Sequence, residues 1–133
     1  MNRCVVIADD DPNIVSLVKL RLELAQYDVV ATNDAVAVMA MVRTRTPDAV
    51  ILDVQMPGGG GLSALAKIKS DPRLNGLPVM MLTGERNADT VMQAMGNGAD
   101  DYMVKPFHPD ALARRVSRLI DRAVKTATST WEI

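Results

Sequence analysis

The stretch Ala49–Gly58 constrains the fold most, because an apolar run ends there at a carboxylate and then at chain breakers. The run from Ala49 to Leu52 is typical of a strand that is covered on both faces. Pro57 and the glycines after it stop the strand, since proline lacks an amide hydrogen and glycine loses the most backbone entropy in regular structure. We therefore expect Asp53 at the carboxyl end of an interior strand.

Four further short apolar runs predict four more strands, at residues 4–8, 28–32, 78–82 and 101–104. Apolar residues at helical spacing predict five helices between and after the strands. The first begins at Pro12, the second is capped by Asn33 or Asp34, and the last begins at Asp110. The third follows a loop at residues 58–61, and the fourth ends at Gly96 and Gly98. Strands and helices that alternate with short connections predict an α/β fold, with a parallel sheet covered on both faces.

Composition narrows the class of protein. A chain of 133 residues with 48% apolar residues suits one domain with a real core. The net charge of −1 gives no bulk electrostatic case for binding nucleic acid or a membrane surface. The single cysteine, Cys4, excludes an internal disulfide and fits a reducing compartment. We see no signal peptide or membrane span, and we expect a cytoplasmic protein. The methionines at 80, 81, 92 and 95 are favoured as core residues over an adaptable partner surface.

The residues at the carboxyl ends of the strands matter most for function, because ligands of such sheets bind there. They are Asp9, Asp10 and Asp11 after the first strand, Asp53 after the third, Thr83 after the fourth and Lys105 after the fifth. Each of these residues alone has an ordinary explanation as a cap, a strand residue or a surface charge. Their occurrence together, at one edge of one sheet, favours a functional site.

Several carboxylates at one edge repel each other unless a hard cation binds among them. Mg²⁺ prefers oxygen ligands. Asp10 and Asp53 can supply direct oxygens, the backbone carbonyl of Gln55 a third, and Asp9 can act through a water. Asp11 is better explained as a helix cap. Mn²⁺ would suit the same oxygens.

A metal, an ammonium, a hydroxyl and a free carboxylate together suit transfer of a phosphoryl group to the carboxylate. Lys105 supplies the ammonium and Thr83 the hydroxyl, so that cationic and polar groups surround the phosphoryl oxygens. Gly84 after Thr83 leaves room for a group of that size. The sequence therefore predicts phosphoryl transfer to Asp53.

With these features, the chain resembles the receiver domain of bacterial two-component response regulators. The resemblance covers residues 3 to about 124. Its motifs are Val6-Ile7-Ala8-Asp9-Asp10-Asp11-Pro12, Leu52-Asp53-Val54-Gln55-Met56-Pro57-Gly58 with Gly61, Leu82-Thr83-Gly84, and Gly98-Ala99-Asp100-Asp101-Tyr102-Met103-Val104-Lys105-Pro106-Phe107. It implies a flavodoxin-like fold with strand order 2-1-3-4-5 and a cis Lys105-Pro106 bond.

The resemblance also implies roles for the residues. Asp53 is implied to accept a phosphoryl group from a sensor histidine kinase or a histidine phosphotransfer protein, with Mg²⁺ held by Asp10, Asp53, the Gln55 carbonyl and Asp9 through a water. Thr83 and Lys105 are implied to hold the phosphoryl oxygens, and Thr83 and Tyr102 to form the switch. The side chains of Gln55 and Glu85 stand at positions that tune the lifetime of the aspartyl phosphate in the family.

Partners follow from the same resemblance. Phosphorylation is expected to change the surface of the fourth helix, fifth strand and fifth helix, which a downstream protein or output domain reads. Dimers through that surface are implied for regulators that drive DNA-binding domains, although Val91 and Ala111 are uncharged where charged partners are usual. Residues 1–125 are predicted to form the receiver and residues 126–133 a tail or the start of a linker. A single-domain regulator and a piece of a longer protein both stay open.

Two other classes remain as alternatives. A pseudo-receiver would bind proteins without phosphoryl transfer, but the intact set of Asp10, Asp53, Thr83 and Lys105 argues against it. An aspartate-nucleophile phosphatase would need a second acid two residues after Asp53, where Gln55 stands. The loop of four glycines at residues 58–61 lacks the usual acidic residue, and we expect it to be mobile. The protein is expected to be a switch with self-catalysed phosphoryl transfer and dephosphorylation, and no other enzymatic activity.

Overall fold

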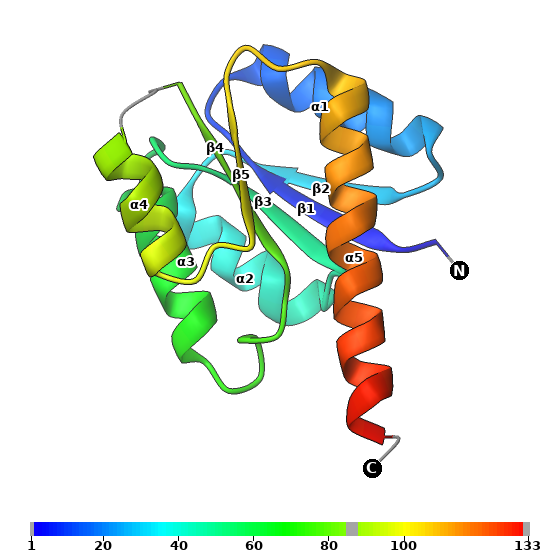
Figure 1. Cartoon of the computed structure of the whole chain (residues 1–133). Coiled ribbons are helices and arrows are strands. Elements are labelled where there is room, and N and C mark those ends of the chain that lie inside the picture. Colours follow the sequence, from blue (N-terminus) through cyan, green and yellow to red (C-terminus); the bar gives the residue numbers. More distant parts are fainter. Residues whose placement is uncertain (1, 85–87, 132–133) are drawn as a thin grey trace.

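The computed structural model describes residues 2–84 and 88–131, and it forms a three-layered α/β fold (Figure 1). Five parallel strands form one sheet in the order β2-β1-β3-β4-β5. The strands are β1 (Cys4–Ala8), β2 (Asp28–Thr32), β3 (Ala49–Asp53), β4 (Val79–Thr83) and β5 (Asp101–Val104). The helices are α1 (Pro12–Leu24), α2 (Ala35–Arg45), α3 (Gly60–Ser70), α4 (Ala88–Gly96) and α5 (Pro109–Trp131). The predicted fold class and strand order are confirmed.

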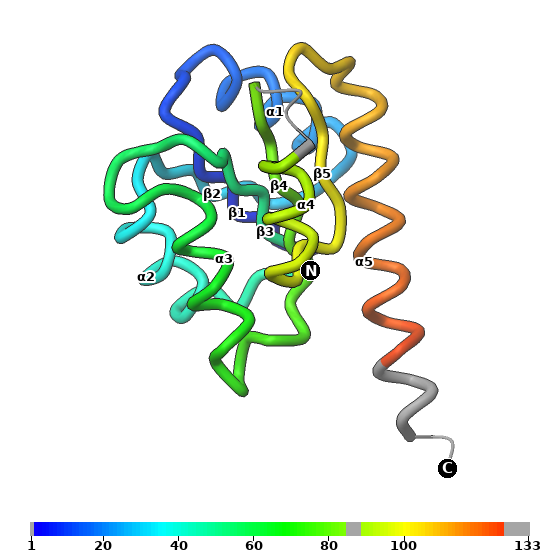
Figure 2. The backbone as a smooth tube through the Cα atoms, turned by 60° about the vertical axis from the view of Figure 1, so that its left-hand side comes forward, coloured from blue at the N-terminus to red at the C-terminus, as the bar shows by residue number. Residues whose placement is uncertain are grey.

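Each face of the sheet has its own apolar core. Helices α1 and α5 cover one face, and α2, α3 and α4 cover the other (Figures 1 and 2). The alternation along β3 shows the division, since Ile51 packs on the α1 and α5 side and Leu52 on the opposite side. Every residue of β3 and β4 is buried, as a continuous apolar run in a parallel sheet requires.

Side-chain caps set where the first two helices begin. Asp11 precedes α1 and its carboxylate accepts from the amide of Asn13 at 2.9 Å. Asp34, and not Asn33, caps α2, and its carboxylate accepts from the amide of Ala37. Each cap satisfies an amide that has no partner within its own helix. The prediction that Asp11 serves as a helix cap is confirmed.

Helix α3 begins at Gly60, inside the segment that we predicted to be a loop. Gly58, Gly59 and Gly60 have φ angles of +84°, +101° and +81°, which glycine adopts without the steric cost of a side chain. The amide of Gly61 donates to the carbonyl of Val54 at 2.9 Å, which places the start of α3 against the end of β3. A Cβ atom at Gly61 would lie 2.0 Å from the carbonyl oxygen of Asp53. The glycines thus permit the close approach of α3 to the strand that carries Asp53.

Two other expectations differ from the structure. Helix α5 is continuous to Trp131, whereas we expected the last helix to end near residue 125, and the boundary of the receiver domain itself stays a prediction. The helix has no glycine or proline after Pro109 to end it. Met80 and Met81 are buried as expected, but the side chains of Met92 and Met95 are 70% and 43% exposed. Helix α4 turns both of these toward solvent, because a surface helix buries only one face.

Candidate functional site

The site begins with three consecutive aspartates that follow β1 and have different environments. Asp9 is fully buried, and its Oδ1 atom accepts from the amide of Asp11 at 2.9 Å. Its own amide donates to the carbonyl of Thr32, so the end of β2 fixes its position. Asp10 is exposed. The chain therefore presents one buried and one exposed carboxylate at the carboxyl edge of the sheet.

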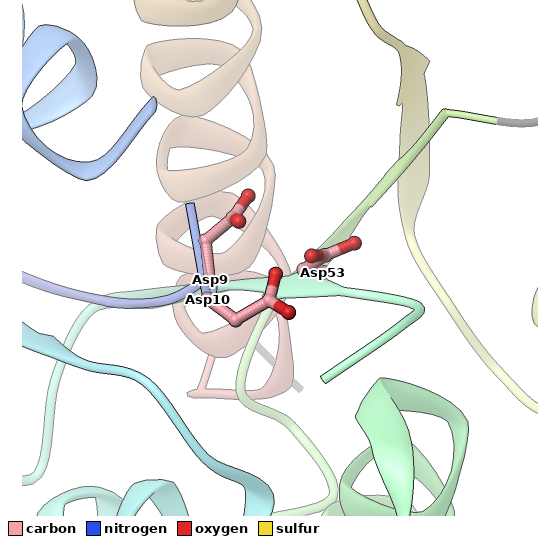
Figure 3. Close-up of side chains that lie close together, drawn as sticks. All are labelled: Asp9, Asp10 and Asp53. Atoms are coloured by element: carbon pink, nitrogen blue, oxygen red, sulfur yellow. The ribbon is translucent and has the colours of Figure 1, made fainter. Parts of the chain in front are cut away.

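Asp53 is the last residue of β3, and it is only 4% exposed. Its Oδ1 atom accepts from the amide of Gln55 at 3.2 Å. The amide of Val54 donates to the carbonyl of Leu82 at 2.8 Å, and this bond ties the strand end to β4. The Asp53 carboxylate thus lies beside the end of β1, close to the carboxylates of Asp9 and Asp10 (Figure 3).

Lys105 supplies the cation of the site. Its Nζ atom lies 2.8 Å from Oδ2 of Asp9 and 3.5 Å from Oδ2 of Asp53. Its amide donates to the carbonyl of Thr83 at 2.7 Å, and the Lys105-Pro106 bond is cis, as predicted. Burial works to lower the pKa of Lys105, but its contacts with Asp9 and Asp53 outweigh burial and raise the pKa. Lys105 is therefore charged, and its ammonium lies closer to the carboxylate of Asp9 than to that of Asp53.

The environment of Asp53 favours its neutral form. Burial is the largest cause and the negative charge of Asp9 the second, and together they raise the pKa of Asp53 to about 6. The charge of Lys105 and the bond from the Gln55 amide act in the opposite direction but do not compensate. One lysine is not enough for the carboxylates gathered here. An additional cation at the site would relieve the repulsion.

The donor atoms fit a hard divalent cation. Asp9, Asp10 and Asp53 each offer one carboxylate oxygen within 4.8 Å of the others (Figure 3). Oδ2 of Asp9 is buried and lies 2.8 Å from the Lys105 ammonium, which it shares with Asp53. Oxygen ligands that carry an excess of negative charge suit Mg²⁺ better than a soft metal.

The remaining predicted residues lie around this cluster to different degrees. Thr83 ends β4 and is buried beside the strand end that carries Asp53. Tyr102 lies in the edge strand β5, half-buried against the core on the α2, α3 and α4 side. Its carbonyl accepts from Arg115 of α5 at 2.8 Å. Glu85 lies outside the described residues.

Sequence reasoning missed the cavity beside the cluster. It has a volume of about 610 Å³ and extends from Asp9 and Asp10 between α1 and the end of β2. Ser16, Thr32 and Asn33 give it polar walls. Asn33 was noted only as a cap for α2, and no periodic pattern in the sequence shows that it faces Ser16. The cavity gives solvent a path to the exposed side of the carboxylates.

A parallel sheet in the order 2-1-3-4-5, with an acidic cluster and a lysine at its carboxyl edge, defines a flavodoxin-like fold, a class in which ligands bind at that edge. A family model, the response regulator receiver domain, matches residues 5–117. The chain belongs to this family, whose members are receiver domains of two-component signalling.

Individual relatives agree with this assignment. The chain is 36% identical over 118 residues to the DNA-binding dual master transcriptional regulator RpaA of Synechocystis. The aligned region covers 89% of this chain and 49% of RpaA. Among solved structures, the CheY-like receiver domain protein of Methanospirillum hungatei has a TM-score of 0.88 and 25% identity, covering 95% of this chain and 99% of that one. The BeF3-activated DrrB receiver domain has a TM-score of 0.81 and 28% identity, covering 91% and 99%.

The chain spans about half the length of the curated relatives that it matches. Within the described residues, no helix is long and apolar enough to cross a bilayer.

Proposed function

We propose that this domain is a signalling switch in which Asp53 accepts a phosphoryl group from a phosphohistidine of a sensor kinase or a histidine phosphotransfer protein. The observation that carries the proposal is the position of Asp53, buried at the edge of the sheet with its Oδ2 atom 3.5 Å from Lys105 and beside Asp9 and Asp10. Family membership supports phosphorylation-dependent signalling. The roles of the single residues are our inference from the family resemblance and, where the residues are described, from their geometry.

In the proposed reaction, an Oδ atom of Asp53 attacks phosphorus. The bond between phosphorus and the imidazole nitrogen breaks, and its electron pair stays with the imidazole. Asp53 must be ionised to attack, and its raised pKa makes a nearby cation important. We propose that Asp10, Asp53 and the Gln55 carbonyl hold Mg²⁺, or Mn²⁺ in its place, with Asp9 acting through a water. The metal neutralises charge on the phosphoryl oxygens when it is bound.

Lys105 and Thr83 are proposed to hold the transferred phosphoryl group. New negative charge on Asp53 would draw Lys105 away from Asp9 and toward the phosphoryl oxygens, because Coulomb attraction rises with charge and proximity. The hydroxyl of Thr83 would donate to the same oxygens. Tyr102 would then turn inward into the space that Thr83 leaves, which changes the surface formed by α4, β5 and α5.

The finer properties of the switch are also proposals. Hydrolysis of the aspartyl phosphate is self-catalysed, and Gln55 and Glu85 tune its rate. A downstream protein or output domain reads the α4-β5-α5 surface, and dimerisation through that surface is one form of this reading. We propose that residues 1–125 form the functional receiver, that it acts in the cytoplasm, and that it contacts neither nucleic acid nor a membrane directly.

Intact mass spectrometry tests the phosphoryl acceptor. The protein is incubated with a small phosphodonor, with and without Mg²⁺, beside Asp53→Asn. We expect one phosphoryl adduct that requires both Mg²⁺ and Asp53. Asp11→Ser is the matched control, because it removes a carboxylate of the same edge but keeps a good helix cap, and it should still form the adduct. Absence of an adduct in every condition would leave a protein-binding pseudo-receiver on the same fold.

A further inference from the structure

A second charged group lies at the opposite, amino edge of the sheet and connects three segments. Lys69 is near the end of α3, and its Nζ atom lies 3.0 Å from Oδ2 of Asp100 and 3.0 Å from the carbonyl oxygen of Leu77. The carbonyl of Asn75 lies at 3.4 Å. Oδ2 of Asp100 also accepts from the amide of Val79 at 2.8 Å. One ammonium therefore joins α3, the turn before β4 and the turn before β5.

The alkyl chain of Lys69 adds a steric contact to these bonds. Gly98 has a φ of +100°, and a Cβ atom there would lie 3.1 Å from Cγ of Lys69. Gly98 is the second residue after α4, and its amide donates to the carbonyl of Met95. The Lys69 side chain is 18% exposed and that of Asp100 is 40% exposed, so the lysine end of the ion pair is sheltered while the carboxylate end faces solvent. Lys69 thus lies over the turn by which α4 leads into β5.

Helix α4 is weakly held by the core. Among its described side chains only Ala94 is buried, whereas α3 buries Gly61, Ala64, Leu65 and Ile68. The amide of Ala99 donates to the carbonyl of Ala94 at 3.1 Å, and Ala99 itself is buried. These contacts place the described attachment of α4 at its carboxyl end, next to Gly98 and Asp100. An element with little buried surface shifts at low cost, so a contact at its attachment point has a large influence on its position.

We propose that Lys69 and Asp100 are positioning residues that stabilise the described position of α4, and that they set how much free energy phosphorylation must supply to move it. The inference rests on the proposed function, because it assumes that α4 moves when Asp53 is modified. In the described arrangement Lys105 is closer to Asp9 than to Asp53, which we assign to the unmodified protein. A ligand shifts an equilibrium only through its different affinity for the two states. Weakening the contact should therefore strengthen binding of a phosphoryl mimic at the opposite edge.

Beryllofluoride is the probe, with Mg²⁺ at saturation, and its affinity is measured by isothermal titration calorimetry. Lys69→Met keeps an unbranched chain over Gly98 but removes the ammonium. We expect beryllofluoride to bind Lys69→Met about three- to tenfold more tightly than the wild type, with an unchanged affinity for Mg²⁺ alone. Amide hydrogen exchange should rise at residues 97–99 and stay unchanged in α2.

Lys67→Met is the matched control, since Lys67 is an exposed lysine on the same helix and makes no ion pair within the described residues. Asp100→Asn is the second variant, because an asparagine can still accept from the Val79 amide but lacks the charge. Its effect should match that of Lys69→Met, and the double variant should add nothing further, because both changes break the same contact.

The outcomes are distinct. An equal beryllofluoride affinity in wild type and both variants, with only a lower unfolding midpoint, would make the contact merely structural and overturn the inference. Weaker binding in the variants would overturn its direction. Failure of the wild type to bind beryllofluoride would instead count against the proposed function, before the variants are compared.

Discussion

The two edges of the sheet treat charge in opposite ways. At the carboxyl edge, Lys105 faces both Asp9 and Asp53, with Asp10 close by, so one ammonium is shared among several carboxylates. At the amino edge, Lys69 is matched to a single carboxylate, and backbone carbonyls and amides complete the contacts of both partners. The carboxyl edge has more negative than positive charge, and a bound cation would relieve this imbalance. At the amino edge, Lys69 and Asp100 are paired with each other within the chain.

The comparison teaches where this fold tolerates strain. Crowded carboxylates raise the free energy of the folded state, and such groups persist where binding or chemistry uses them. The Lys69–Asp100 contact has no such cost, since each of the two charges has a partner of opposite sign and the Val79 amide has an acceptor. Differences between matched substitutions at the two edges therefore test the assignment.

The largest expected effect concerns glycines near the two edges. Gly61→Ala would place a Cβ atom 2.0 Å from the carbonyl oxygen of Asp53, and neither backbone segment can move freely, because Gly61 also bonds Val54. We expect a loss of about 3 kcal/mol or more in the free energy of unfolding, measured with urea. Gly76→Ala, near the amino edge, has no atom within 4 Å of the added carbon and should change stability by less than about 1 kcal/mol. A loss for Gly61→Ala as small as that for Gly76→Ala would mean that α3 can shift away from β3.

The second prediction concerns the sign of the charge effect at the carboxyl edge. The folded-state pKa of Asp53 is raised to about 6, so the folded protein binds more protons than the unfolded chain between the usual carboxyl value and pH 6. Stability contributed by the protonated form is therefore lost as the pH rises through this window. In a chelating buffer at pH 7.5, Asp53→Asn should be more stable than the wild type by about 1 to 3 kcal/mol.

Two measurements separate this effect from a general gain in packing. The advantage of Asp53→Asn should shrink when urea unfolding is repeated at pH 5, where the wild-type carboxyl is protonated. Mg²⁺ should raise the unfolding midpoint of the wild type more than that of Asp53→Asn, since ligand binding to the folded state stabilises it. If Asp53→Asn is less stable than the wild type at pH 7.5, the excess of negative charge at the carboxyl edge does not destabilise the folded protein, and the assignment is contradicted.

The alternation of strands and helices was predictable from the sequence, because each strand is a short apolar run that ends at a polar residue or a glycine. The strand order came from the resemblance to receiver domains and not from these runs. The same rule located Asp9, Asp53, Thr83 and Lys105 at one edge, since the ends of parallel strands meet there. Asp11 was also correctly assigned as a cap, because proline at the next position marks the start of a helix.

Contacts between distant residues were not predictable in the same way. Lys69 and Asp100 are 31 residues apart, and no periodic pattern relates them. Nor does composition show that Lys105 lies closer to Asp9 than to Asp53, because the two distances, 2.8 Å and 3.5 Å, differ by less than 1 Å. Helix α5 passed the expected boundary because its sequence contains no residue that ends a helix, and polar composition alone is a weak sign of a linker.

The third and smallest effect sharpens the comparison with a carboxylate at the amino edge. Asp48 precedes β3, and its Oδ2 atom accepts from the amide of Cys4 at 2.8 Å, while its own amide donates to the Cys4 carbonyl at 2.8 Å. Asp48→Ala leaves the Cys4 amide without its side-chain acceptor and should lower the free energy of unfolding by about 1 kcal/mol. This sign is opposite to that expected for Asp53→Asn.

Asp48→Asn divides the contribution of Asp48 into hydrogen bond and charge. The amide oxygen can still accept from Cys4, so urea unfolding should be close to that of the wild type. Burial is the largest cause of the raised pKa of the Cys4 thiol, and the charge of Asp48 is the second. Removing that charge should lower the thiol pKa and speed labelling of Cys4 at pH 8. If Asp48→Asn is as unstable as Asp48→Ala, the negative charge itself stabilises the amino edge, and the contrast between the two edges lies in geometry instead of charge balance.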